Sequence, residues 1–287
     1  MYVLVTDSAA NLPDALIDHM SLPVIPFSYE MGGETFFGYE KGKPTDNKPF
    51  YDRMRQGETA STAQITSAVY TDFFEPFLKQ GMDVLYIGFS SALSGSFNNA
   101  VMAAQELRGK YPGRSVVPVD SLSASLGQGL LVYYAMMEKE AGKSLDELAR
   151  WVEENRLHLC HWFTVDDLVY LKRGGRISAA TALMGAMLGI KPILHVDDEG
   201  RLVSVGKVRG RRNSVAEMFA RMKETCVHPE GQTIFIGHGD CEEDARLLES
   251  MVRTLPVKDV TIGQIDAVIG AHSGPGTLAL FFLGSRR

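Results

Sequence analysis

The sequence predicts an α/β fold. Its first half alternates short strands with helices, which is typical of a parallel sheet with crossover helices. The strands are apolar throughout rather than at every second position, as expected of strands that are covered on both faces. The second half begins with an alternating strand, and we expect a mixed sheet with helices there. We place a domain boundary near Asn155, which divides the chain into residues 1–155 and 156–287.

The expected elements of the first domain follow from apolar runs and helical periodicity. Apolar runs predict strands over residues 2–5, 24–27, 84–89 and 116–120. Helical periodicity predicts helices over residues 13–20, 50–56, 66–79, 97–108, 126–141 and 145–154. Turn residues and aromatic residues between 31 and 39 predict a small hairpin at the edge of the sheet.

In the second domain, a strand over 157–165 leads into a short helix and a turn at 172–178. An uncharged helix over 179–188 follows, rich in small residues and methionine, a composition typical of a core helix and also compatible with the lining of an apolar tunnel. The remaining elements are helices over 213–225 and 241–254, and strands over 192–196, 201–205, 233–237, 260–264, 268–272 and 278–283.

Composition restricts the class of protein. Apolar residues make up 45% of the 287 residues and charged residues 22%, which is ordinary for a globular protein. A formal charge of −6 argues against broad nucleic-acid binding, which depends on neutralising phosphates. Three cysteines without a CxxC motif indicate a reducing compartment. The uncharged stretch 177–190 is shorter than the roughly 20 residues that span a bilayer. We therefore expect a cytoplasmic protein without a membrane-spanning segment.

Two turns rich in hydroxyl groups are the main functional signal. The apolar strand over 84–89 runs into Ser-Ser-Ala-Leu-Ser-Gly-Ser at 90–96, which opens a helix. A second hydroxyl cluster at 59–66 precedes another helix. Ligands in open α/β sheets lie beyond the carboxyl ends of the strands, and helix N-termini favour anions. Thr62 and Ser94 are thus predicted to bind a small anionic head group. The alternative is that both are helix N-caps, a common role of serine and threonine that is compatible with an anion site.

Two other segments carry candidate ligand-binding residues. His272 ends an expected strand and is followed by two glycines, so it can bind an anion, act as a base, carry a phosphoryl group or simply be a hydrogen-bonded, partly buried histidine. Arg176 follows two glycines and precedes a helix, so it can reach the anion or a partner's phosphate, or pair with Asp166 or Asp167. The four cations in 207–212 indicate a solvated surface or a docking patch.

The sequence also allows other kinds of functional site. Gly88-Phe-Ser-Ser-Ala92 approaches the nucleophile elbow of serine hydrolases, and Asp120 and His272 follow Ser90 in the order of a triad. The fifth position of that motif is alanine rather than glycine. A metal site is not expected, because His161 on a strand points opposite to His158 and Cys160.

Taken together, these motifs resemble those of the DegV family of fatty-acid-binding proteins over nearly the whole chain. Each motif alone is unspecific, and the resemblance depends on their common order and spacing. They are VTDS at 5–8, TAQIT at 62–66, SSALSGS at 90–96, VDS at 119–121, LVYLKRGGRIS at 168–178, IKPI at 190–193, KVRG at 207–210 and IGAHSGPG at 269–276.

The resemblance implies a non-enzymatic carrier that holds one long-chain fatty acid between two α/β domains, without a cofactor or a metal. It also implies that the carrier presents the carboxylate to a separate ATP-dependent fatty acid kinase, which forms an acyl phosphate. The first domain then carries the head-group loops, and the second completes the acyl-chain tunnel. The ligand-binding residues implied are Thr62, Ser94, Gly95, Arg176 and His272.

The threonine motif departs from the form that the family usually shows, Thr-Ser-Gln-Pro-Ser. Ala63 replaces the serine and Ile65 replaces the proline. Two other functions remain as alternatives: a serine hydrolase that acts on acyl esters through Ser90, and a phosphocarrier that uses His272.

Overall fold

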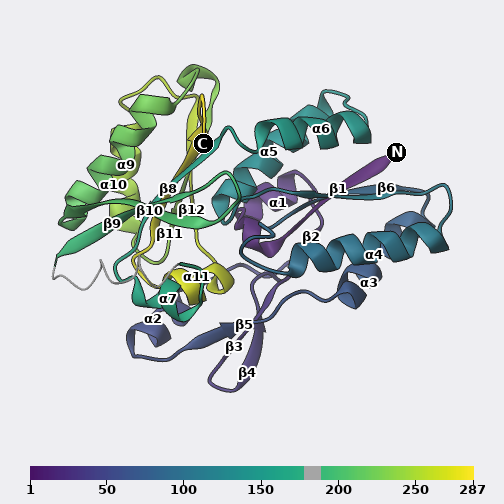
Figure 1. The fold of residues 1–287 in the computed structure, drawn as a ribbon, viewed down its shortest axis with the longest axis horizontal. Helices are drawn as coiled ribbons and strands as arrows, with labels where there is room; N and C mark the ends of the chain where they lie inside the picture. The colour runs from purple at the N-terminus through teal and green to yellow at the C-terminus, as the bar shows by residue number, and fades with distance from the viewer. Residues whose placement is uncertain (178–188) are drawn as a thin grey trace.

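The structure is a computed structural model that describes residues 1–177 and 189–287. Within these residues it contains a four-stranded sheet, a six-stranded sheet and a small three-stranded sheet, with helices around them (Figure 1). The larger two sheets are the parallel and the mixed sheet expected from the sequence, so the predicted α/β fold is confirmed.

The four-stranded sheet is parallel throughout, with the strand order β2-β1-β6-β7. Its strands are β1 (Tyr2–Asp7), β2 (Val24–Ile25), β6 (Asp83–Gly88) and β7 (Val116–Asp120). The chain passes from β1 to β2 on one side and later adds β6 on the other side of β1. The strand order therefore reverses between β1 and β6, the position at which such sheets bind ligands.

Helices cover both faces of this sheet, because side chains along each strand alternate between the faces. In β6, Val84 and Tyr86 belong to one hydrophobic cluster, and Leu85 and Ile87 belong to another. The first cluster includes side chains of α3 (Ser67–Lys79) and α4 (Ser96–Lys110). The second includes side chains of α1 (Asp14–His19), α5 (Leu126–Glu140) and α6 (Leu145–Asn155).

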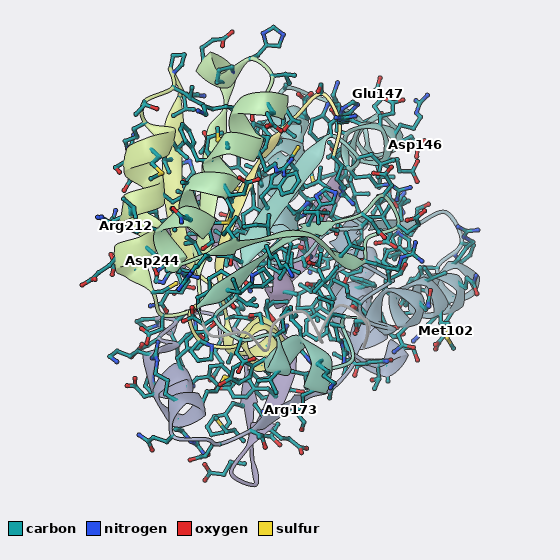
Figure 2. All side chains as sticks on the ribbon, turned by 60° about the vertical axis from the view of Figure 1, so that its left-hand side comes forward. Met102, Asp146, Glu147, Arg173, Arg212 and Asp244 are labelled. Carbon is teal, nitrogen blue, oxygen red and sulfur yellow. The ribbon has the colours of Figure 1, made fainter. Side chains whose placement is uncertain are left out.

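The first turn of α6 has a capping box that fixes where the helix starts. The backbone N–H of Glu147 donates to the Ser144 hydroxyl, and the backbone N–H of Ser144 donates to the Glu147 carboxylate at 2.8 Å. Asp146 and Glu147 lie at the surface in this turn (Figure 2), where their negative charge favours the helix N-terminus.

The six-stranded sheet has the order β10-β9-β8-β13-β11-β12, and its pairs are antiparallel except for β11 and β12. Its outer face is covered by α9 (Arg211–Thr225) and α10 (Glu242–Val252), and α5 packs on its inner face. The strands are β8 (Leu159–Thr164), β9 (Ile190–Val196), β10 (Leu202–Arg209), β11 (Thr233–His238), β12 (Asp259–Gln264) and β13 (Leu278–Leu283).

One hydrophobic cluster joins the two larger sheets. It includes Leu85 from the parallel sheet, Leu130 from α5 and Phe281 from the mixed sheet. Each large sheet draws its strands from one side of residue 155. The division into two domains at this residue stays a prediction.

The third sheet contains the predicted hairpin and one strand that the sequence pattern does not predict. Strands β3 (Ser28–Met31) and β4 (Glu34–Phe37) form the hairpin, and β5 (Ala60–Thr62) pairs with β3. Near this sheet lie the short helices α2 (Lys48–Arg55), α7 (Val169–Arg173) and α11 (Ala267–Ser273) (Figure 1). The described residues also form the 3₁₀ helices η1 (Ser8–Ala10) and η3 (Pro229–Gly231).

The strand predicted over 268–272 is wrong, because these residues form α11. The Asp266 side chain caps the helix by accepting the backbone N–H of Ile269 at 2.9 Å, and Gly274 ends it with φ +81°. A short apolar run does not distinguish a strand from one buried helical turn.

The helix predicted over 179–188 lies outside the described residues. Among the helices that are described, none is both long and apolar enough to cross a membrane.

Candidate functional site

A pocket lies between the carboxyl ends of β1 and β6 and the inner face of the six-stranded sheet. It contains about 910 Å³ of space between atoms, part of it open to solvent. Most side chains on its wall are apolar, among them Phe27, Phe89, Phe163, Val196, Leu202 and Phe281.

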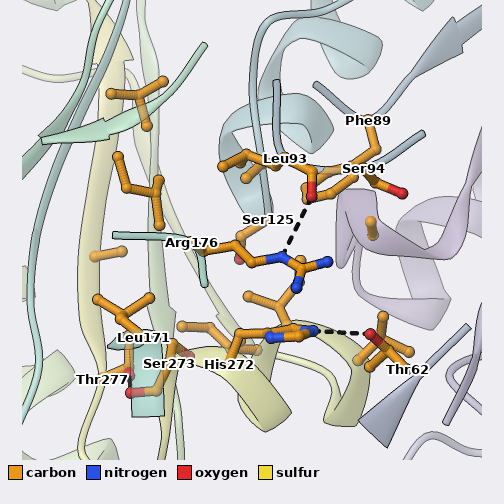
Figure 3. A pocket seen from close by; sticks show the side chains of 18 of the residues that line it. Thr62, Phe89, Leu93, Ser94, Ser125, Leu171, Arg176, His272, Ser273 and Thr277 are labelled. Atoms are coloured by element: carbon orange, nitrogen blue, oxygen red, sulfur yellow. Dashed lines mark hydrogen bonds between the residues drawn. The ribbon is translucent and has the colours of Figure 1, made fainter. Parts of the chain in front are cut away.

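Four of the residues singled out in the sequence line this pocket: Thr62, Ser94, Arg176 and His272. They come from four separate segments, namely β5, the turn between β6 and α4, the segment after α7, and the last turn of α11. Figure 3 shows the four side chains close together, with the Arg176 guanidinium between Ser94 and the Thr62–His272 pair. The fold thus gathers these four polar side chains on one side of a pocket whose wall is mostly apolar.

A buried carboxylate holds the β6–α4 turn beside β1. Asp7, at the end of β1, accepts the backbone N–H groups of Ala9 at 3.1 Å and Phe89 at 3.0 Å. It also accepts the Tyr86 hydroxyl at 2.6 Å and the Gln128 amide at 3.1 Å. Burial raises the pKa of Asp7, and these donors oppose that rise. Asp7 therefore helps to build the floor of the site without entering the pocket.

His272 makes the polar contact that joins α11 to β5. Its Nε2 lies 2.8 Å from the Thr62 hydroxyl oxygen (Figure 3). Burial and the positive charge of Arg176 lower the pKa of His272 to about 4, so the imidazole is neutral at pH 7. The other ring nitrogen, Nδ1, is buried and has no hydrogen-bond partner within residues 1–177 and 189–287. A β-carbon at Gly174 would lie 2.2 Å from this Nδ1, so only glycine fits there.

Ser94 is held by a chain of hydrogen bonds at the start of α4. Its hydroxyl oxygen lies 2.9 Å from that of Ser96 and accepts the Ser96 backbone N–H at 3.2 Å. The fully buried Ser96 hydroxyl accepts the backbone N–H of Ile65 at 3.1 Å. The segments that carry Thr62 and Ser94 are therefore bonded to each other through Ile65 and Ser96. The sequence alone assigns no role to Ser96, although the Ser-Gly-Ser pattern at 94–96 is a signal for such a bond.

Arg176 is half-buried and reaches across the mouth of the pocket. Its Nε donates to the Leu93 carbonyl at 3.3 Å, and its Nη1 donates to the Gly174 carbonyl. Burial lowers the pKa of Arg176. The alternative partner considered from the sequence, Asp166, forms an ion pair with Lys191 at 2.6 Å instead.

Gly95 differs from the other four predicted ligand-binding residues because it does not line the pocket. A β-carbon at Gly95 would lie 2.6 Å from Oε1 of Gln64, and Gln64 is on the pocket wall. The structure thus places Gly95 where it makes room for Gln64.

An open groove lies on the outer side of the same polar residues. It shares Thr62, Arg176 and His272 with the inner pocket. Its other lining residues include Glu30, on β3, and Arg173, at the end of α7, which Figure 2 shows at the surface. The three shared side chains therefore lie between an apolar interior and the surface of the molecule.

The geometry does not assemble the serine hydrolase triad. The Ser90 hydroxyl is fully buried and donates to the Gly200 carbonyl at 2.9 Å. Asp120 accepts the backbone N–H groups of Ser91 and Leu122, and His272 contacts Thr62. The hydrolase hypothesis is therefore not supported, because its nucleophile is bonded to a carbonyl rather than to a base.

The structure also shows where the possible metal ligands and the basic residues of 207–212 lie. No group of three or more histidine, cysteine, aspartate or glutamate side chains in the described residues is arranged to hold a metal ion. In the basic segment, Lys207 and Arg209 lie on the exposed edge strand β10, and Arg211 pairs with Asp244 at 2.9 Å. Figure 2 shows both Arg212 and Asp244 at the surface of the molecule.

Comparison with known proteins gives consistent matches over the whole chain. The family whose sequence model matches residues 1–285 is described as "Uncharacterised protein, DegV family". A DegV domain-containing protein of Clostridium perfringens is 45% identical over 287 residues, which cover 100% of this chain and 98% of that protein.

Solved structures also match this chain over nearly its whole length. A DegV family protein of Thermus thermophilus, described by its fatty acid binding, superposes with a TM-score of 0.88 at 29% identity and covers 99% of both chains. A protein of Eubacterium ventriosum, described as binding stearic acid, superposes with a TM-score of 0.86 at 25% identity and covers 98% of this chain and 97% of its own.

Proposed function

The chain belongs to the DegV family, and we propose that it binds one long-chain fatty acid in the pocket between its two large sheets. The observation that carries the proposal is the placement of Thr62 and Ser94 on the wall of one largely apolar pocket. The acyl chain lies along the apolar wall, and the carboxylate lies between the two hydroxyl groups. The fatty-acid-binding relatives of the same fold support this assignment.

The Thr62–His272 contact orients the Thr62 hydroxyl toward the ligand. A neutral imidazole has one N–H, and a buried N–H without an acceptor is costly. Because Nδ1 of His272 lies against Gly174, the hydrogen is placed better on Nε2, where it donates to Thr62. The Thr62 oxygen is then an acceptor in this contact, and its own hydrogen is free to donate to the carboxylate.

The same reasoning applies to Ser94. The buried Ser96 hydroxyl accepts from Ile65, and the acceptor within reach of its own hydrogen is the Ser94 oxygen. Ser94 thus accepts from Ser96, and its hydrogen is free for the ligand. Both head-group hydroxyls are directed by a buried partner, which favours two short hydrogen bonds to one carboxylate.

Affinity and orientation come from different parts of the ligand. Burying one methylene group contributes about 0.8 kcal/mol, so a chain of about fifteen contributes on the order of 10 kcal/mol before ordering costs. The head group adds less, but it determines which end of the chain lies near the groove.

We further propose that the protein is a carrier rather than an enzyme, and that it presents the carboxylate to a separate fatty acid kinase. Thr62, Arg176 and His272 line both the pocket and the outer groove, so a carboxylate bound there lies near the surface. In the proposed reaction, a carboxylate oxygen attacks the γ-phosphorus of ATP held by the kinase, and ADP leaves. The carrier supplies position, and the kinase supplies the chemistry.

Native mass spectrometry of the purified protein tests the binding proposal. We expect one long-chain fatty acid per chain, lost from the double variant Thr62→Ala, Ser94→Ala. Thr59→Ala with Ser91→Ala is the matched control, because neither residue lines the inner pocket. A wild-type protein that is empty and takes up no added stearic acid contradicts the proposal. Presentation is tested separately by trapping acyl phosphate with hydroxylamine after incubation with the kinase and ATP.

A further inference from the structure

The strands of the six-stranded sheet order the apolar wall of the acyl pocket from the head-group end inward. Thr277 lies near the head-group end, because its hydroxyl oxygen is 3.0 Å from the carbonyl oxygen of Ser273, the residue that follows His272. Ala279 and Phe281 come next on the same face of β13, at the strand's period of two, and both line the pocket. The wall from Thr277 to Phe281 therefore spans about 13 Å of strand.

Two rows of side chains cross the inner face of the sheet along this path. In the first row, Ala279 lies opposite Phe163 of β8, and in the second row, Phe281 lies opposite His161. The register of β9 places Val196 beside His161 in the second row. All five residues line the pocket. An acyl chain that leaves the head-group end thus passes the first row before it reaches the second.

The space in the pocket decreases in the same direction. Among the inward-facing side chains of β8, the exposed fraction falls from 8% at Phe163 to 1% at His161 and 0% at Leu159. On β13, Ala279 is 4% exposed, whereas Leu280 beside it faces the opposite side of the sheet and is 0% exposed. The small exposed fractions of the inward-facing residues are therefore exposure to the pocket, and on β8 this exposure ends at the second row.

The start of α5 lies directly behind the second row. A β-carbon at Gly127 would lie 2.3 Å from Nε2 of His161 and 2.9 Å from Cδ1 of Phe281, so the backbone of α5 packs against the edges of both rings. The two rings meet edge-on with 5.5 Å between their centroids. In addition, Nδ1 of His161 lies 3.0 Å from the carbonyl oxygen of Leu159. The His161 and Phe281 rings are thus fixed in place against a helix.

We propose that the His161 and Phe281 rings close the acyl pocket and limit the length of the fatty acid, and that Ala279 is a specificity-determining residue because its small side chain leaves the first row open. The inference rests on the proposed fatty-acid binding and specifies its ligand by chain length. Each methylene group adds affinity until the terminal methyl group meets the two rings. A large side chain at position 279 closes the pocket one row earlier, about 7 Å closer to the head group.

A series of saturated fatty acids from capric to behenic acid tests the closed end, with each acid competing for a bound fluorescent fatty acid. We expect the affinity of the wild type to rise about fourfold per methylene group up to one chain length and to fall beyond it. An affinity that still rises at behenic acid overturns the proposal. If no acid of the series binds to the wild type, the fatty-acid function itself is contradicted instead.

Variants of β13 test the assignment to residues. Ala279→Leu fills the first row, so we expect stearic acid to bind about tenfold more weakly or worse, because its last methylene groups are excluded, while capric acid binds as to the wild type. Binding of capric acid also shows that this variant is folded. Phe281→Leu makes the end wall smaller and is expected to move the optimum to a longer acid.

Leu280→Met is the matched control on the same strand. Leu280 packs in the cluster under α9 and α10 and does not line the pocket, and the exchange conserves volume, so we expect the optimum chain length of the wild type. If Ala279→Leu weakens capric and stearic acid equally, or leaves the optimum chain length unchanged, Ala279 does not determine which chain the pocket accepts.

Discussion

The hydroxyl oxygen of Thr62 lies 2.8 Å from Nε2 of His272, although the two residues are 210 positions apart in the sequence. This contact joins the small three-stranded sheet to helix α11 on the wall of the acyl pocket. With the hydrogen on Nε2, as proposed above, His272 donates to Thr62 and gives its hydroxyl one direction. The predictions below begin with this contact.

Removing the donor from His272 is expected to weaken fatty-acid binding. His272→Phe keeps a planar ring but leaves the Thr62 hydroxyl without its buried partner, so affinity for stearic acid falls about tenfold, the worth of one hydrogen bond. Displacement of a fluorescent fatty acid measures the change. His272→Gln retains an N–H donor and is expected to lose less. If His272→Phe binds stearic acid as tightly as the wild type, His272 does not position the Thr62 hydroxyl for the ligand.

A methyl group at Gly174 is expected to have a similar effect without changing either polar residue. The new β-carbon would lie 2.2 Å from Nδ1 of His272, so the ring has to leave the position in which it contacts Thr62. Gly109→Ala is the control, since a β-carbon in this part of α4 meets nothing within 4 Å and alanine favours a helix. We expect weaker stearic acid binding for Gly174→Ala only, as measured by calorimetry. Equal affinity in both variants contradicts the positioning role of the glycine.

The order of strands and helices was largely predictable from the sequence, because apolar runs and helical periodicity are local signals. Two short segments depart from this order. Residues 268–272 form a helix because of the Asp266 cap, and Ala60–Thr62 form a strand because β3 lies alongside. Both results depend on contacts with distant residues that the local pattern does not contain.

The sequence indicates which residues belong to the candidate site, but not how they contact one another. Thr62 and Ser94 follow from turn chemistry, whereas their connection through Ile65 and Ser96 appears only in the fold. Ile65 stands where the family resemblance predicts proline, which has no backbone N–H to donate to Ser96. This departure from the usual motif therefore adds a hydrogen bond rather than removing one.

Asp266 is expected to make stability depend on pH. Burial raises its pKa from 3.8 to about 7, so the folded state holds a proton that the unfolded state releases between these values. Stability from this residue is therefore present at low pH and is lost as the pH rises toward 7. Asp266→Asn keeps a capping side chain for α11 and removes the titration.

The relative stability of the two proteins checks this dependence. We expect the difference in the free energy of unfolding to shift in favour of Asp266→Asn between pH 4 and pH 8. The shift is on the order of 4 kcal/mol, since each pH unit between the two pKa values corresponds to about 1.4 kcal/mol. Urea unfolding at both pH values measures it, with the exposed Asp18→Asn as control. If the difference in the free energy of unfolding between the two proteins does not change with pH, the pKa of Asp266 is not raised by burial.

Ser90 is expected to be structural and unreactive. Its buried hydroxyl donates to the Gly200 carbonyl, so a fluorophosphonate should not label the folded protein. Ser90→Ala should lower the free energy of unfolding by about 1 kcal/mol through loss of this hydrogen bond and leave stearic acid binding intact. Mass spectrometry detects labelling, and a covalent adduct on Ser90 would restore the hydrolase hypothesis.

The most direct test of the central proposal is a crystal structure of the protein with stearic acid. We expect the two carboxylate oxygens within hydrogen-bonding distance of the Thr62 and Ser94 hydroxyls, and the tail along Phe163 and Phe281 on the wall of the pocket. A carboxylate that points to the opposite end, or a lipid bound outside this pocket, contradicts the proposed function.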